Sequence, residues 1–78
     1  MDVTEIAPRI TVDEKARFGK PVIAGTRVPA SVVVGHLAAG DAIESVMEEF
    51  GLVREDVLAA LAYAAQLLDE DEFQPLAK

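Results

Sequence analysis

The sequence has no cysteine and no tryptophan, and aromatic residues make up only 5% of its 78 positions. Without cysteine the chain forms neither disulfides nor thiolate metal sites, which fits a reducing compartment. The hydrophobic fraction of 51% must therefore build its core from valine, isoleucine, leucine and alanine. A chain this short leaves much of its surface exposed when it folds alone, so we expect a single domain that gains from burial against a second copy.

Long apolar runs and a basic leader are missing as well. No stretch approaches the ~20 apolar residues that a membrane-spanning helix needs. The first residues mix acidic and apolar side chains, whereas a secretion signal has a basic segment followed by an apolar one. We therefore expect a cytoplasmic protein with no membrane partner.

The side chains that carry most enzyme chemistry are scarce. His36 is the one histidine, and Ser31 and Ser45 are the two serines, neither of them in a Gly-x-Ser-x-Gly setting. No pair of nucleophile and general base can be assembled from these residues. The glycines near Lys20 lack the Gly-Lys-Ser/Thr ending of a phosphate-binding loop. We expect no enzyme, no cofactor, no bound metal and no small-molecule substrate.

Charge is unevenly divided along the chain, whose formal net charge is −7. Residues 1–27 carry five basic and four acidic side chains, whereas residues 28–78 carry two basic and ten acidic ones. An acidic surface is repelled by phosphates, so any nucleic acid would have to be bound with help from the first third of the chain.

A short stretch of strands is predicted before the first helix. Residues 9–13 alternate polar and apolar side chains, which places Ile10 and Val12 on the buried side of a strand. A loop leads from there to Pro21–Ile23, with turns at Gly19 and Gly25, where glycine tolerates positive φ. We predict a β-hairpin, or a small meander, that depends on the helices or on a second copy for stability.

Three helices are predicted to follow. Pro29 suits the first turn of a helix and Gly40 its end, although the three valines at 32–34 would suit a strand equally well by propensity. Asp41 is the expected N-cap of a second helix that ends at Gly51. The third helix spans about Arg54 to Asp69, and part of its broad apolar face is expected to contact a partner. That face contains Val57, Leu58, Leu61, Ala62, Ala65 and Leu68.

This pattern predicts a mainly α fold in one domain over residues 1–78. A β-hairpin arm would span residues 8–29, a three-helix bundle residues 29–70, and an acidic tail with a few apolar anchors residues 71–78. Most tails of this kind are simply solvated. The last two helices also have the order and spacing of a helix-turn-helix, although plain three-helix packing produces the same pattern.

The run from Gly19 to Pro29 is the most individually specified segment of the chain. Arg27 lies between a turn and the strand-to-helix switch, so its guanidinium would project from stiff backbone and could bind carboxylate or phosphate. An ion pair with an acid of this chain or of a dimer partner is the other interpretation. The candidate contacts to a partner or to nucleic acid are Arg17, Lys20, Arg27, Arg54 and Phe73.

The same run carries a resemblance to the small bacterial proteins of the domain of unknown function 433 family. The resemblance covers roughly residues 8–68. The chain differs from the family pattern at Glu14, where proline is usual, at Phe18, where a second glycine is usual, and at Val53, where a hydroxyl residue normally caps the last helix. Its carriers are Ile10 and Asp13, Gly19-Lys20-Pro21-Val22-Ile23-Ala24-Gly25-Thr26-Arg27-Val28-Pro29, Leu37-Ala38-Ala39-Gly40, Leu52, Glu55-Asp56-Val57 and Ala59-Ala60-Leu61-Ala62-Tyr63-Ala64.

The resemblance implies a β-hairpin followed by a homeodomain-like three-helix fold, and a homodimer. It also implies an antitoxin of a type II toxin–antitoxin pair, of the VapB type, whose partner is a PIN-like nuclease toxin. Binding to operator DNA, and so control of its own operon, is implied more weakly. The alternatives are a helix-turn-helix DNA-binding regulator without a toxin, and a structural protein-interaction module.

Overall fold

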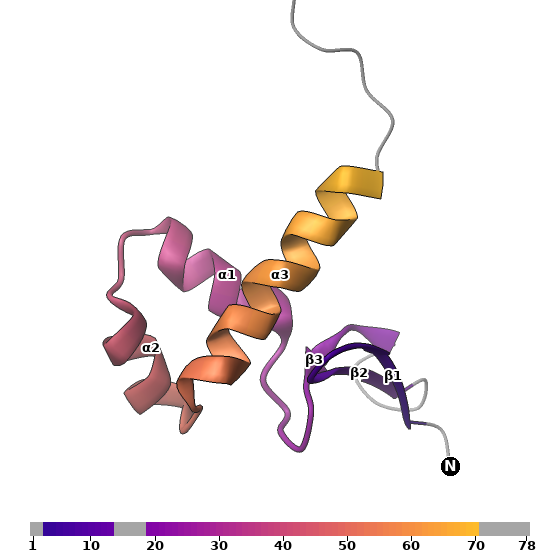
Figure 1. The fold of residues 1–78 in the computed structure, drawn as a ribbon. Coiled ribbons are helices and arrows are strands. Elements are labelled where there is room, and N and C mark those ends of the chain that lie inside the picture. Colours follow the sequence, from indigo (N-terminus) through magenta and orange to yellow (C-terminus); the bar gives the residue numbers. More distant parts are fainter. Residues whose placement is uncertain (1–2, 14–18, 71–78) are drawn as a thin grey trace, which may run out of the picture.

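The fold consists of a small sheet followed by three helices, and a computed structural model describes residues 3–13 and 19–70 of it. The strands are β1 (Val3–Ala7), β2 (Ile10–Asp13) and β3 (Val22–Ile23), and the helices are α1 (Ala30–Ala38), α2 (Ile43–Phe50) and α3 (Arg54–Glu70). The sheet lies at one end of the molecule beside the first half of α3, with α1 and α2 beyond it (Figure 1). The mostly helical fold with an N-terminal antiparallel sheet confirms the coarse prediction.

The sheet has the order β1-β2-β3, and both of its pairings are antiparallel. The predicted strand at residues 9–13 corresponds to β2, whose Ile10 is fully buried, whereas Val12 is only half-buried. Strand β1 was not predicted, because Val3, Thr4, Glu5 and Ile6 are all exposed and therefore show no period-two contrast between a buried and a solvated face.

One core joins the sheet to all three helices. Val33 of α1, Val46 of α2, and Val57 and Ala60 of α3 are essentially inaccessible to solvent. They pack with Ile10, Ile23, Ala30 and Leu52. Every described strand and helix contributes to this core except β1, which borders it through the partly buried Ala7. The absence of large rings from this cluster agrees with the aliphatic core expected from composition.

Helices α1 and α2 end at glycines in left-handed conformations. Gly40 has a φ of 100°, its N–H donates to the carbonyl of Leu37, and the N–H of Asp41 donates to the carbonyl of His36. This pair of bonds is the Schellman motif, which satisfies carbonyls left over at a helix end. Gly51 ends α2 with a φ of 68°.

The predicted helix starts need two corrections. Pro29 is the N-cap of α1, not a residue of its first turn, because its ψ of 140° is extended. The N-cap of α2 is Ala42, without a side-chain hydrogen bond, so the prediction of Asp41 as N-cap was wrong. The carboxylate of Asp41 instead contacts Nδ1 of His36 at 2.7 Å, and the ring of that histidine meets Phe50 edge-on.

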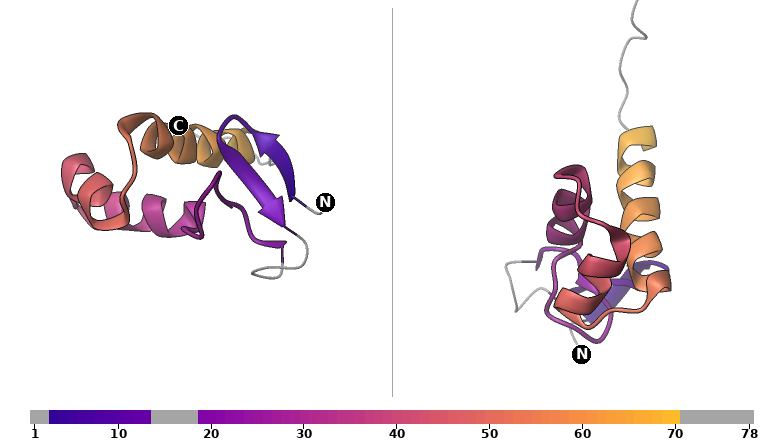
Figure 2. Two further views of the ribbon diagram at one scale, coloured as in Figure 1. Left: turned by 90° about the horizontal axis from the view of Figure 1, so that it is seen from below. Right: turned by 90° about the vertical axis from the view of Figure 1, so that its left-hand side faces the viewer.

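The far half of α3 extends past the other elements, as the right-hand view of Figure 2 shows. The buried residues of this helix, Val57 and Ala60, belong to its first half, while Leu67 and Leu68 in the second half are exposed. Among the described residues, no helix has the length and apolar character that a membrane crossing demands.

Candidate functional site

The loop between Ile23 and Val28 is held by hydrogen bonds centred on Thr26. The Thr26 hydroxyl donates to the carbonyl of Ile23 at 2.7 Å and accepts the N–H of Val28 at 3.0 Å. The backbone adds a bond of 2.9 Å from the N–H of Ile23 to the carbonyl of Val28, and Gly25 takes a φ of 77° at the turn. The loop is therefore a closed, internally bonded unit.

The ends of this loop are attached to the rest of the fold. The N–H of Ala24 donates to the carbonyl of Arg9, and the N–H of Ala30 donates to the carbonyl of Pro21. Val22 and Pro29 form an isolated antiparallel bridge. Because Ile23 is also fully buried, the chain from residue 21 to residue 30 is anchored on the β2 side and on the α1 side.

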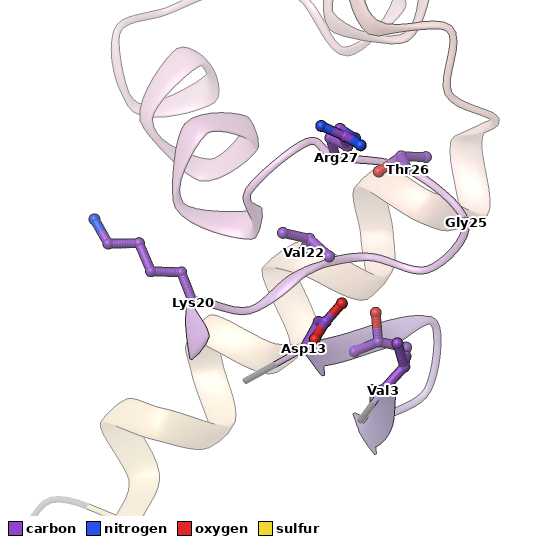
Figure 3. Close-up of a pocket in the computed structure, with 8 residues that line it drawn as sticks. Val3, Asp13, Lys20, Val22, Gly25, Thr26 and Arg27 are labelled. Carbon is purple, nitrogen blue, oxygen red and sulfur yellow. The ribbon is translucent and has the colours of Figure 1, made fainter. Parts of the chain in front are cut away.

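A concavity of about 590 Å³ is lined by this loop, by Lys20 and Val22 just before it, and by residues of β1 and β2. Figure 3 shows Val22 between Lys20 and Arg27, with Asp13 of β2 on the opposite wall. Most of the wall comes from the Gly19–Pro29 run, which sequence analysis singled out, and the rest comes from the sheet. The lining residues are Val3, Thr11, Asp13, Lys20, Val22, Gly25, Thr26 and Arg27.

The charges of this concavity are predominantly positive. Lys20 and Arg27 are exposed, and no hydrogen bond or ion pair joins either side chain to another residue within the described ranges. Asp13 lines the same wall and has an interaction partner of its own. The intrachain ion pair considered for Arg27 is therefore not formed with any described residue, which leaves two cations at the rim for carboxylate or phosphate groups.

Comparison with known proteins identifies the family. The model of a family described as a protein of unknown function, DUF433, matches residues 10–64. The chain belongs to the DUF433 family. The matched span begins at β2, includes the whole Gly19–Pro29 run with its concavity, and continues into α3.

A solved structure similar to this DUF433 chain is the crystal structure of Rv2018 from Mycobacterium tuberculosis. The two are 29% identical in sequence and superpose with a TM-score of 0.60. The match covers 67% of this chain and 24% of Rv2018, so the chain spans only about a quarter of that protein's length. No curated protein matches the sequence.

The structure brings together only two of the five predicted contact residues. Lys20 and Arg27 share the concavity, whereas Arg54 begins α3 and is not among the residues lining it. The Arg54 guanidinium lies 4.0 Å from the Glu44 carboxylate, and both side chains are largely exposed. Arg17 and Phe73 lie outside the described residues.

Arg9 has a role that sequence analysis missed. It occupies the turn between β1 and β2 with a φ of 65°, and its guanidinium donates to Asp56 of α3 at 2.8 Å. Asp56 also accepts the N–H of Val53 at 3.3 Å, and so bonds to the residue where a capping hydroxyl is absent. The absence of a capping hydroxyl at Val53 indicated that another side chain must accept a backbone N–H at the start of α3, as Asp56 does. No local pattern indicated that Arg9 would bind that carboxylate.

His36, the one histidine of the sequence, lies on α1 and is not among the residues that line the concavity. Its Nδ1 lies 2.7 Å from the Asp41 carboxylate, and its ring meets Phe50 edge-on. No three acidic or histidine side chains within residues 3–13 and 19–70 gather closely enough to hold a metal ion. The concavity itself offers a concave surface with two exposed cations, Lys20 and Arg27.

Proposed function

We propose that the protein is a cytoplasmic type II antitoxin that neutralises a PIN-like ribonuclease by protein contact at the concavity of Lys20 and Arg27. The observation that carries the proposal is the position of these two exposed cations on the central motif of a DUF433 chain. The resemblance supplies the class of partner, and the concavity supplies a surface that can meet it.

Charge complementarity supports a nuclease as the partner. Nucleases that work through Mg²⁺ collect carboxylates around the ion, which makes the catalytic region strongly acidic. A guanidinium such as that of Arg27 can bind a carboxylate through two parallel hydrogen bonds. Because the rest of this chain is acidic, only its basic first third would be drawn to such a surface, so the charge pattern also orients the encounter.

The rigidity of the loop supports the same proposal. Association costs free energy when loops and side chains must be ordered at the interface. The Thr26 hydrogen bonds and the buried Ile23 hold the backbone of Arg27 before any partner arrives. The guanidinium is thus presented from a fixed position, and only its own rotamers remain to be ordered.

The proposal is tested by purifying the tagged chain from its native cell after nuclease treatment and identifying proteins that co-purify. We expect a stoichiometric small ribonuclease whose cleavage of RNA is blocked by the chain. The variant K20A/R27A should bind it at least tenfold more weakly, because two charged contacts are lost. The matched control is S45E, which also makes the chain more acidic, at an exposed position of α2 outside the concavity, and should bind as the wild type does.

Two other outcomes would overturn the proposal. Equal binding by K20A/R27A and the wild type would exclude the concavity as the surface that binds the nuclease. Capture through the concavity of a stoichiometric partner that is not a nuclease would make the chain a structural protein-interaction module.

A DNA-binding regulator is the second candidate, favoured by the order α2, Gly51, α3, because a helix-turn-helix also consists of two helices joined by a short turn that often contains glycine. Arg54 at the start of α3 would then reach a groove, and residues of the basic first third would bind the backbone. Apart from Arg54, α3 offers only Gln66 among the side chains usual in a recognition helix. Affinity for promoter DNA that falls steeply with salt would favour this candidate, and flat or absent binding at low salt would exclude it.

A further inference from the structure

The middle of α3 has no charged side chain. Residues 57–68 read Val-Leu-Ala-Ala-Leu-Ala-Tyr-Ala-Ala-Gln-Leu-Leu, and a helix that is apolar on all sides is normally buried on all sides. Here only one side is buried, through Val57 and Ala60. Leu58, Leu61 and Leu68 on the other side are 46%, 38% and 69% exposed.

These exposed residues form one regular stripe. Positions 54, 58, 61, 65 and 68 are spaced by alternating steps of four and three residues, which is the a/d spacing of helices that pack along their length. Arg54 begins the stripe, and Leu58, Leu61, Ala65 and Leu68 continue it. A shallow hollow of about 630 Å³, lined by Ala62, Ala65, Gln66, Leu68 and Asp69, lies along the same side.

We propose that a second copy of the chain packs on this stripe through its own α3, in antiparallel orientation, with the twofold axis between residues 61 and 62. This axis sets each Leu58 against the partner copy's Ala65, and each Leu61 against the partner copy's Ala62. Large side chains then meet small ones, and the leucines fill the hollow at the alanines. An interface that is complementary to itself in this way is the kind that a twofold dimer requires.

The charges of Arg54 and Asp69 also favour the antiparallel arrangement. Arg54 and Asp69 lie at equal distances along the sequence from the proposed axis, so each Arg54 faces the partner copy's Asp69. Both side chains are exposed, and the contact of Arg54 with Glu44 is long at 4.0 Å. A parallel pair would place Arg54 against Arg54 and Asp69 against Asp69, and it would also align the two helix dipoles unfavourably.

The affinity of self-association is the first test. Sedimentation equilibrium on the chain should show a monomer–dimer equilibrium, and A62E should raise its dissociation constant at least tenfold, because it brings two carboxylates together at the axis. Ala62 is exposed, so the substitution leaves the core intact. S45E adds the same charge on an exposed position of α2 and should dimerise as the wild type does. A wild type that is monomeric at all concentrations, or an A62E dimer of undiminished affinity, would overturn the proposal.

Orientation is tested by cross-linking, which the natural absence of cysteine makes specific. R54C and D69C are prepared separately and treated with a short bismaleimide, alone and as a mixture. Antiparallel packing predicts a cross-linked dimer in the mixture and little in either variant alone. Cross-linking within each variant alone would indicate parallel packing and overturn the proposed geometry.

The inference does not depend on nuclease binding. K20A/R27A leaves α3 untouched and should dimerise like the wild type, so loss of the nuclease and loss of the dimer are separable results. The reverse also holds, since A62E lies outside the concavity and tests the dimer alone.

Discussion

The loop from Ile23 to Val28 and the far half of α3 both present groups that a partner could bind, but the fold holds them in opposite ways. The loop is fixed by short hydrogen bonds and by a fully buried isoleucine. The far half of α3 extends beyond the other elements and exposes Leu67 and Leu68 (Figure 1). Charged groups bind directionally, so they need a fixed backbone, whereas apolar burial is non-directional and needs only a regular surface.

The largest expected contrast is between two truncations to alanine. I23A removes a fully buried side chain beneath the loop and should lower the free energy of unfolding by about 2–5 kcal/mol. L68A removes a side chain that is 69% exposed and should change it by less than about 0.5 kcal/mol. Urea denaturation at concentrations where the chain is monomeric measures both, and equal losses would contradict the contrast.

A smaller effect is expected from the hydroxyl that closes the loop. T26V keeps the shape of the side chain but removes the donor to Ile23 and the acceptor for Val28, which should cost about 1–2 kcal/mol of stability. T26S retains the hydroxyl and is the matched control. Hydrogen exchange of the Val28 amide should accelerate in T26V beyond what the global loss of stability explains. Unchanged exchange would mean that the hydroxyl does not hold the loop.

The helices could be predicted from sequence because their signals are local. Ile43, Val46, Met47 and Phe50 recur at intervals of three to four residues, which is typical of an amphipathic helix. The structure places Val46 in the core, with the other three partly buried against it.

What periodicity could not decide is which side of α3 is buried, because that helix is apolar all round. In the structure, Val57 and Ala60 are buried, whereas Leu58, Leu61 and Leu68 are exposed. The sequence prediction had placed Val57 and these leucines on one apolar face.

The part of the candidate site that lies on the Gly19–Pro29 run could be predicted because its signals are local as well. Lys20 and Arg27 lie on one motif, and the turn at Gly25 brings both to one surface. Asp41 was misassigned because a local pattern cannot show that its carboxylate is engaged by His36. Arg9 and Asp56 are separated by 47 positions, and only the packing of the sheet on α3 brings them together.

That pair gives the smallest predicted effect, and it links the two regions compared here. Arg9 lies in the β1–β2 turn, where its carbonyl accepts the N–H of Ala24 in the loop. Its guanidinium donates to Asp56 of α3. Its side chain is 49% exposed and that of Asp56 is 15% exposed, so solvent screens the attraction and the coupling should be only about 0.5–1 kcal/mol.

A double-mutant cycle of R9A and D56A isolates that coupling. The bond from the N–H of Val53 to Asp56 is lost in D56A and in R9A/D56A alike, so its contribution cancels. The coupling should shrink with added salt. The matched cycle of R54A and E44A, across 4.0 Å of exposed surface, should give a coupling near zero. Equal couplings in the two cycles would mean that the sheet is not tied to α3 by charge, leaving Ile10, Ile23, Val57 and Ala60 to join the two regions alone.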